Sequence, residues 1–189
     1  MSFTNNHQNL LYAKERFEND HSLLKKISMT MNFLGSSSFS SSPIINIDQR
    51  AIVFDLSKGA NIHNVPIKGL KIDEFSRLVE DAMYSENTGY GFGRWAEVRE
   101  IYANEFFNST VEGSNEKRDV HLGVDVFCQS GEDIFTPLDG RIHIKSNNKN
   151  ELDYGPMLIL EHSNDNDELF YTLYGHLSLA SIANIEEGQ

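Results

Sequence analysis

Two residues that can bind a metal, His121 and Asp125, stand four positions apart in the valine-rich stretch 118–127. In a β-strand alternate side chains share a face, so the imidazole and the carboxylate would project to the same side, with Gly123 between them. Imidazole nitrogen and carboxylate oxygen are both good zinc ligands. The spacing therefore indicates a candidate metal pair, and on spacing alone an ordinary surface pair is the alternative.

The β-branched residues around this pair favour a strand over a helix. The side chains that alternate with the pair are expected to point into a core; they are Val120, Leu122, Val124 and Val126. A later segment, 169–174, is expected to be a strand that delivers His176 just after its end. Taken alone, His176 is a histidine in a turn after Gly175.

Four sequence blocks together resemble the lysostaphin-type zinc endopeptidases. The blocks are His121-Leu-Gly-Val-Asp125, residues 131–142, residues 153–162 and residues 171–178. They match, in order, the family blocks H-x-G-x-D, G-x-P-V-x-A-x-x-D-G-x-V, Y-G-x-x-V-x-I-x-H and T-x-Y-x-H-L. The resemblance implies an antiparallel β-sheet peptidase domain of the duplicated-hybrid-motif type over residues 118–189.

The resemblance also implies a role for each matching residue. His121 and Asp125 would be two Zn²⁺ ligands, and His176 would assist catalysis beside the metal without binding it. The implied reaction is hydrolysis of peptide amide bonds, which in the family belong to peptidoglycan-like cross-bridges. The last family block, H-x-H, carries the third ligand and occurs nowhere in the 189 residues. Because a catalytic zinc usually has three protein ligands, we expect weak zinc binding and a longer natural chain, or else a degenerate relic.

Two other functions are compatible with the sequence. One is a non-catalytic binding or spacer module that uses the same fold. The other is a carrier or phosphotransfer domain, because related β-rich folds carry glycine turns like Pro137-Leu-Asp-Gly140. The spacing of His121 and Asp125 and the Tyr-Gly-His block around His176 count against the carrier.

The region upstream of the peptidase-like blocks shows a second, weaker resemblance. Residues 47–57 and 93–102 are similar to the segment that precedes this domain in large fused proteins. There, an aminoglycoside-phosphotransferase-like kinase precedes the domain and a class III aminotransferase-like domain follows it. This architecture implies covalently fused neighbours and a cytoplasmic location, which the polar residues 1–10 also favour if Met1 is the true start.

Composition limits the possible partners. The net charge of −12 disfavours nucleic acid, because phosphate binding needs a basic surface. No apolar run is long enough for a membrane helix. Cys128 is the only cysteine, so no disulfide forms within the chain, and a half-buried position is expected for it.

The sequence predicts an α+β fold in which a helical and hairpin-containing N-terminal region precedes the sheet domain. We expect an N-terminal unit over 1–34 with a helix at 7–31, a serine-rich linker over 35–43, and a small α/β region over 44–117. Within that region, a hairpin is expected from 44–47 and 51–57, loop over 58–71 and a helix over 72–85. A flexible turn at 89–94 is expected to lead into a helix over 94–107, with Trp95 in its apolar stripe.

Beyond residue 130 the pattern is all β. A hairpin is expected from 134–138 and 141–145 around the Asp139-Gly140 turn, and strands are expected at 157–162 and 169–174. The remaining histidines have plainer interpretations: a structural hydrogen bond for His162, and a surface position for His143 and His63.

Overall fold

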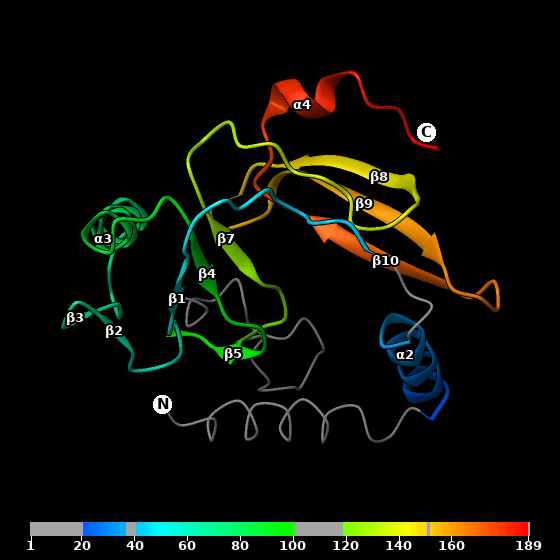
Figure 1. Cartoon of the computed structure of the whole chain (residues 1–189), viewed down its shortest axis with the longest axis horizontal. Coiled ribbons are helices and arrows are strands. Elements are labelled where there is room, and N and C mark those ends of the chain that lie inside the picture. The colour runs from blue at the N-terminus through cyan, green and yellow to red at the C-terminus, as the bar shows by residue number, and fades with distance from the viewer. Residues whose placement is uncertain (1–20, 37–40, 101–118, 151, 189) are drawn as a thin grey trace. The chain divides into compact units, whose positions relative to one another are not determined.

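The computed structural model describes residues 21–36, 41–100, 119–150 and 152–188, and Figure 1 draws the whole chain. The chain divides into two compact units, Met1–Glu18 with Ile47–Glu132 and Asn19–Asn46 with Asp133–Gln189. Both units combine helix with short, mostly antiparallel strands, so the chain is an α+β protein, as the sequence predicts.

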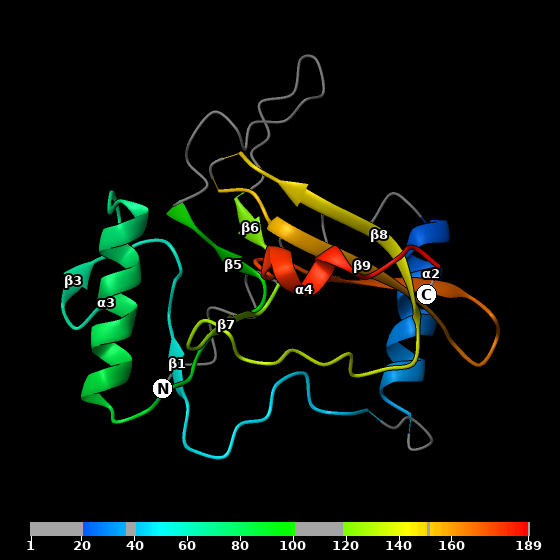
Figure 2. The same ribbon diagram turned by 90° about the horizontal axis from the view of Figure 1, so that it is seen from above.

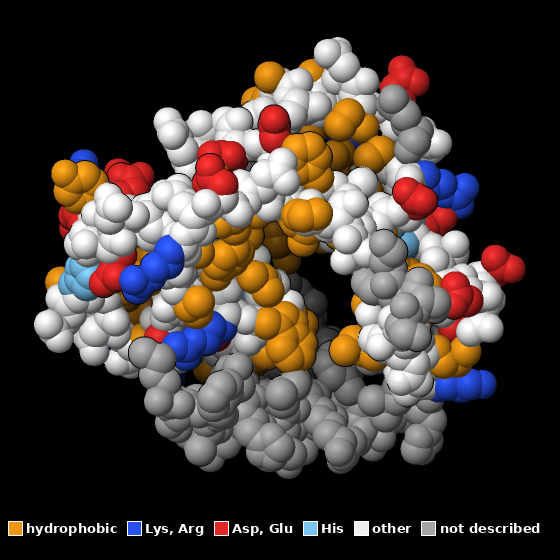
Figure 3. All heavy atoms as spheres, viewed as in Figure 1, with side chains coloured by type: hydrophobic (Ala, Val, Ile, Leu, Met, Phe, Trp, Pro, Cys, Tyr) orange, Lys and Arg blue, Asp and Glu red, His pale blue; other side chains and the backbone are white. Residues whose placement is uncertain are grey.

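Two features of the composition, the lack of a long apolar run and the excess of acidic residues, can be followed in the structure. No helix within these described ranges is long and apolar enough to cross a membrane. On the face drawn in Figure 3, the acidic side chains are scattered among other side chains and do not gather in one patch.

The main sheet of the first unit has three short strands. In order across the sheet, these are β1 (Ile52–Phe54), β4 (Gly91–Gly93) and β7 (Asp125–Phe127). β1 runs parallel to β4, and β7 runs antiparallel to β4. The middle strand therefore comes from the glycine-rich segment for which the sequence predicts a flexible turn, and that prediction is wrong.

Two smaller strand pairs complete the β structure of this unit. They are β2 (Asn61–Ile62) with β3 (Val65–Pro66), and β5 (Glu97–Val98) with β6 (Val120–His121). The first pair is a tight hairpin whose two turn residues, His63 and Asn64, both have positive φ, as a type I′ turn requires. The segment predicted as loop thus contains a short hairpin.

The predicted hairpin of residues 44–47 with 51–57 is wrong. Residues 44–47 form no strand, and β1 pairs with β4, about forty residues away along the chain. Because Gly91 has no side chain, the ring of Phe54 packs directly against the β4 backbone. Local turn signals miss this pairing, because it depends on a contact that is distant in sequence.

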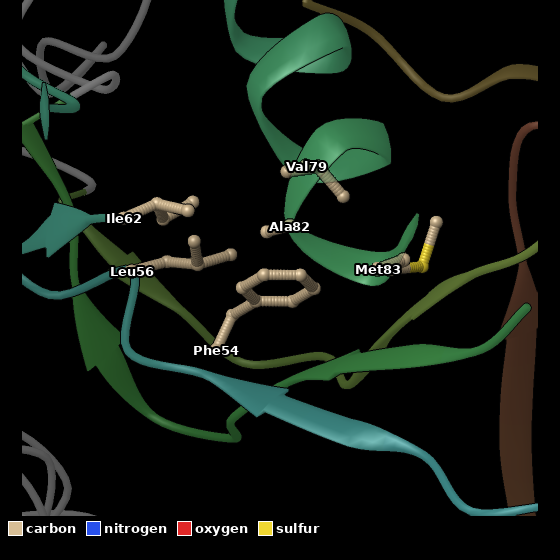
Figure 4. Packing of buried hydrophobic residues seen from close by; sticks show 6 residues of the cluster. All are labelled: Phe54, Leu56, Ile62, Val79, Ala82 and Met83. Carbon is tan, nitrogen blue, oxygen red and sulfur yellow. The ribbon is translucent and has the colours of Figure 1, made fainter. Parts of the chain in front are cut away.

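Helix α3 covers Ile72–Ser85 and has the predicted bounds. Its first turn contains two acidic residues, which the helix dipole favours, and the Glu74 carboxylate accepts a hydrogen bond from the Lys71 backbone N–H at 2.8 Å. Its buried face packs on the sheet. Figure 4 shows this core, which consists of Phe54, Leu56, Ile62, Val79, Ala82 and Met83.

The second unit is built on an antiparallel sheet with the order β10 (Leu169–Tyr174), β9 (Gly155–Ser163) and β8 (Arg141–Asn148). The predicted strands at 157–162 and 169–174 are confirmed. The predicted hairpin of 134–138 with 141–145 is wrong, since β8 pairs with β9. Residues 134–138 instead bond to an earlier segment, with Phe135 N–H donating to the Ile44 carbonyl at 2.8 Å.

Two helices belong to this unit. α2 (His21–Leu34) agrees with the described part of the predicted helix. The earlier residues of that prediction lie outside the described ranges. Phe33 of α2 contacts the Phe170 ring. α4 (Leu179–Ala183) is capped by the Ser178 side chain and lies over β9 (Figure 2), where Ile182 packs against Leu158 and Leu160.

Candidate functional site

His121 and Asp125 lie on two different short strands. His121 ends β6 and Asp125 begins β7, and the chain between them passes from one strand pair to the other. Leu122 and Val124 in this crossing are 55% and 58% exposed, so the prediction that they point into a core is wrong. The expected single strand is replaced by a bend, because each half pairs with a different partner.

The bend nevertheless brings the two predicted ligands together. His121 Nε2 lies 3.6 Å from Asp125 Oδ1, and the two side chains are 20% and 28% exposed. The imidazole also lies directly against Gly123. The pair is therefore half-buried and closely spaced, with no side chain at Gly123 to crowd the ring.

A buried arginine holds the other oxygen of Asp125. Arg99 Nη2 donates to Asp125 Oδ2 at 2.6 Å and to Glu97 Oε2 at 2.8 Å. Glu97 is only 1% exposed, and its Oε1 accepts the backbone N–H of Leu56 at 3.1 Å. A continuous polar network thus runs from the Leu56 backbone, just after β1, through Glu97 and Arg99 to Asp125.

Strand register explains why these groups meet. Glu97 lies opposite His121 in the β5–β6 pair, and Gly93 lies opposite Asp125 in the β4–β7 pair. A Cβ atom at Gly93 would lie 2.5 Å from Asp125 Oδ2 and 3.1 Å from Arg99 Nη2. Only glycine at this position leaves room for the carboxylate and the guanidinium to approach the strand.

Glu97 and Arg99 were missed by the sequence analysis, which predicts a helix over 94–107. Residues 97–98 form a strand and Trp95 is 46% exposed, so the helix is wrong at its start; residues 101–118 lie outside the described ranges. The available signal was the alternation of Glu97 and Arg99, which on a strand share a face. The helical spacing of the nearby apolar residues obscured it.

The charges of Glu97, Asp125 and Arg99 do not cancel. Burial lowers the pKa of Arg99, but the carboxylates of Asp125 and Glu97 outweigh burial and raise this pKa above its ordinary value. Two carboxylates against one guanidinium leave one net negative charge when His121 is neutral. A protonated His121 would balance this charge, and a bound divalent ion would leave one net positive charge.

His176 belongs to the second unit. It follows β10 in the left-handed region, with φ of 57°, and its side chain is exposed. Its backbone N–H donates to the Tyr154 carbonyl at 2.7 Å, and the next residue, Leu177, donates to Pro156 at 2.9 Å. The pKa of the Asp153 carboxyl is lowered, first by the hydrogen bond from the Tyr154 N–H and then by other hydrogen bonds. Attraction to His176 contributes less to this lowering.

The environments predicted for His162, His143 and His63 are confirmed. His162 is 3% exposed and is hydrogen-bonded through both ring nitrogens, at 2.8 Å to the Asp139 carbonyl and at 2.8 Å to Thr172 Oγ1. His143 and His63 are exposed. Cys128 is half-buried, as predicted, and burial raises the pKa of its thiol.

The distance between His121 and Asp125 suits zinc. Bond lengths of about 2.0–2.2 Å and tetrahedral angles place two zinc ligands roughly 3.4 Å apart, and the observed separation is 3.6 Å. In the part of the chain that the structure describes, no group of three His, Cys, Asp or Glu residues is arranged to hold a metal ion. Among the described residues, His121 and Asp125 therefore form a close pair without a third potential metal ligand.

Comparisons with protein-family models, curated proteins and solved structures found no match to this chain.

Proposed function

We propose that the chain carries the zinc-binding part of a lysostaphin-type endopeptidase domain with the duplicated-hybrid-motif fold, acting on amide bonds of peptidoglycan-like peptides. The observation that supports this most directly is the 3.6 Å separation of His121 Nε2 and Asp125 Oδ1. That distance is close to the spacing of two ligands on one zinc ion. His121 and Asp125 are the proposed Zn²⁺ ligands.

Arg99 has a positioning role in this proposal. Its 2.6 Å hydrogen bond to Asp125 Oδ2 fixes the plane of the carboxylate and turns Oδ1 toward His121. Hydrogen bonds of this kind, from a side chain behind the ligand, orient metal ligands. Glu97 in turn compensates the Arg99 charge, so that the guanidinium does not by itself neutralise the site.

The resemblance supplies the proposed chemistry, since a zinc ion polarises a peptide carbonyl and activates water. His176 is the proposed assisting residue. Its left-handed backbone and its bond to the Tyr154 carbonyl hold the imidazole in an exposed turn, where a peptide has access. Single residues in this backbone region often occur at functional sites.

Zinc titration followed by the NMR signals of the histidine side chains tests this proposal. We expect weak, saturable binding that shifts the His121 imidazole, because two protein ligands hold zinc less tightly than three. His121→Ala and Asp125→Asn should each abolish saturation. The matched control is His143→Ala, which removes an exposed histidine next to Glu161 and should leave binding unchanged. Zinc that binds equally well to all three variants would refute the assignment of the ligands.

A non-catalytic binding or spacer module is the second candidate, and the Arg99 contact favours it. At 2.6 Å from Asp125, the guanidinium already binds the carboxylate that a metal would use. In this alternative the network is purely structural and joins β5, β6 and β7. It predicts that zinc leaves the His121 signal unchanged and that the chain does not cleave peptide amides.

A further inference from the structure

β10 forms one edge of the described sheet of the second unit. β10 pairs with β9 over six residues in regular register, without a bulge, and among the described residues no strand pairs with its outer side. The strand sequence Leu-Phe-Tyr-Thr-Leu-Tyr contains no charge, proline or glycine. Such an edge is a template for a further strand, because its outward N–H and C=O groups lack a ladder.

The opposite edge strand, β8, likewise has no strand on its outer side among the described residues, but it is irregular and charged. β8 carries a register shift between Ile142 and Ile144, and it contains Arg141 and Lys145. The Ile142 carbonyl accepts a hydrogen bond from the Gly188 N–H at 2.8 Å. Bulges, charges and covering segments are the usual protection of an edge strand. β8 has all three, whereas β10 has no bulge and no charge, and no segment among the described residues pairs with its outer side.

The two faces of β10 also differ. Its alternate residues Phe170, Thr172 and Tyr174 are held by side chains of this unit: Phe170 by Phe33, Thr172 by His162, and Tyr174 by the core below α4. The other three, Leu169, Tyr171 and Leu173, are 53%, 48% and 43% exposed. Of these, Tyr171 donates its hydroxyl hydrogen bond to Glu161 Oε2 at 3.1 Å, and its ring lies against His143. The strand thus presents an exposed row of two leucines and a tyrosine on one face of the sheet, beside its edge backbone.

The exposed row is complementary to itself. In antiparallel pairing, directly opposite residues project to the same face of a sheet. A twofold axis at Tyr171 would place Tyr171 against its own counterpart and Leu169 against Leu173 in both halves. Apolar side chains would then meet in every exposed pair, and aromatic and aliphatic cross-strand pairs stabilise sheets.

We propose that β10 pairs antiparallel with β10 of a second copy of this chain, joining two three-stranded sheets into one six-stranded sheet about a twofold axis. A second copy is the occupant that the edge itself specifies, because the same uncharged strand supplies both halves of an isologous contact. The net charge of −12 on each copy opposes this association. Added salt should therefore strengthen it by screening the repulsion.

Sedimentation velocity of the full chain over a wide concentration range, at low and moderate salt, tests the pairing. We expect a monomer–dimer equilibrium that shifts toward dimer with added salt. The double substitution Leu169→Lys and Leu173→Lys should give monomer throughout, because like charges would then face each other across the axis. The matched control is Leu179→Lys, which changes a 58% exposed leucine on α4 and should leave the dimer unchanged.

Hydrogen exchange of the unsubstituted chain provides a test that does not depend on how the variant folds. Amides within 169–174 should become better protected as the dimer forms, while amides of the β8 edge should not change. A chain that stays monomeric, a dimer with unchanged protection in β10, or open-ended assemblies without a dimer would each overturn the proposal.

Discussion

Replacing Arg99 by methionine should destabilise the protein far more than replacing any surface arginine. The side chain is 8% exposed and binds two carboxylates, Glu97 at 2.8 Å and Asp125 at 2.6 Å. Methionine fills much of the same volume but leaves Glu97, at 1% exposure, as a buried charge without its partner. Breaking a buried ion pair in this way costs about 3–5 kcal/mol.

The expected loss is large enough to measure by two methods. Urea unfolding should give a free energy lower by about 3–5 kcal/mol with an unchanged slope. For a chain of this size each kcal/mol lowers Tm by roughly 2–4 °C, so Tm should fall by roughly 6–20 °C. The matched control is Arg50→Met, because Arg50 pairs with Glu86 on the surface, with side-chain exposures of 80% and 42%. That variant should lose at most about 1 kcal/mol.

A double variant separates the lost attraction from the orphaned charge. Adding Glu97→Gln to Arg99→Met removes the buried negative charge, so the double variant should be more stable than Arg99→Met alone. If Arg99→Met loses no more stability than Arg50→Met, or if the double variant is the least stable of the set, the buried network does not have the energetic role described here.

Three further predictions follow from local contacts. The hydrogen bond from Arg141 holds the pKa of Glu161 below its ordinary value. The stability that this carboxylate contributes is therefore complete above the ordinary carboxyl pKa and is lost as pH falls through the lowered pKa. In unfolding experiments from neutral to acid pH, the free energy of unfolding should change less with pH for Glu161→Gln than for the unsubstituted chain. Burial raises the pKa of Cys128, so its thiol should react with a disulfide reagent more slowly in the folded chain than in urea at the same pH; equal rates would contradict this. Gly93→Ala would place a Cβ 2.5 Å from Asp125 Oδ2 and should cost about 1–3 kcal/mol by overpacking; a thermal melt at the unsubstituted Tm would show that the strand has room to move.

Elements whose signals are local were predicted well. α3 has both predicted bounds because its apolar residues, Phe75, Leu78, Val79 and Ala82, repeat at helical spacing after an acidic first turn. Strands β9 and β10 were found from runs of aliphatic and aromatic residues. In these segments the residues that determine the element lie within it.

Elements that depend on distant partners were not predicted. Turn-forming residues suggested hairpins at 48–50 and 139–140, but β1 and β8 pair with strands at 91–93 and 155–163. The sequence 89–94 was interpreted as flexible because glycine is permissive. In the structure Gly93 is needed at the centre of a sheet, where Asp125 and Arg99 leave no space for a side chain.

The candidate site was predicted in part, for the same reason. His121 and Asp125 were identified from their type and spacing, and their side chains lie 3.6 Å apart although the backbone between them bends. Arg99 and Glu97 were missed because a buried ion pair on β5 is set by its register with β6. Alternating charges on a short strand resemble surface residues until the partner strand is known.

The most direct test of the proposed metal site is an anomalous-scattering measurement at the zinc absorption edge, on crystals of the full chain grown with zinc. The account predicts a peak within bonding distance of both His121 Nε2 and Asp125 Oδ1, with the Arg99–Asp125 hydrogen bond kept. Zinc bound elsewhere, or absent from this pair at saturating concentration, would contradict it.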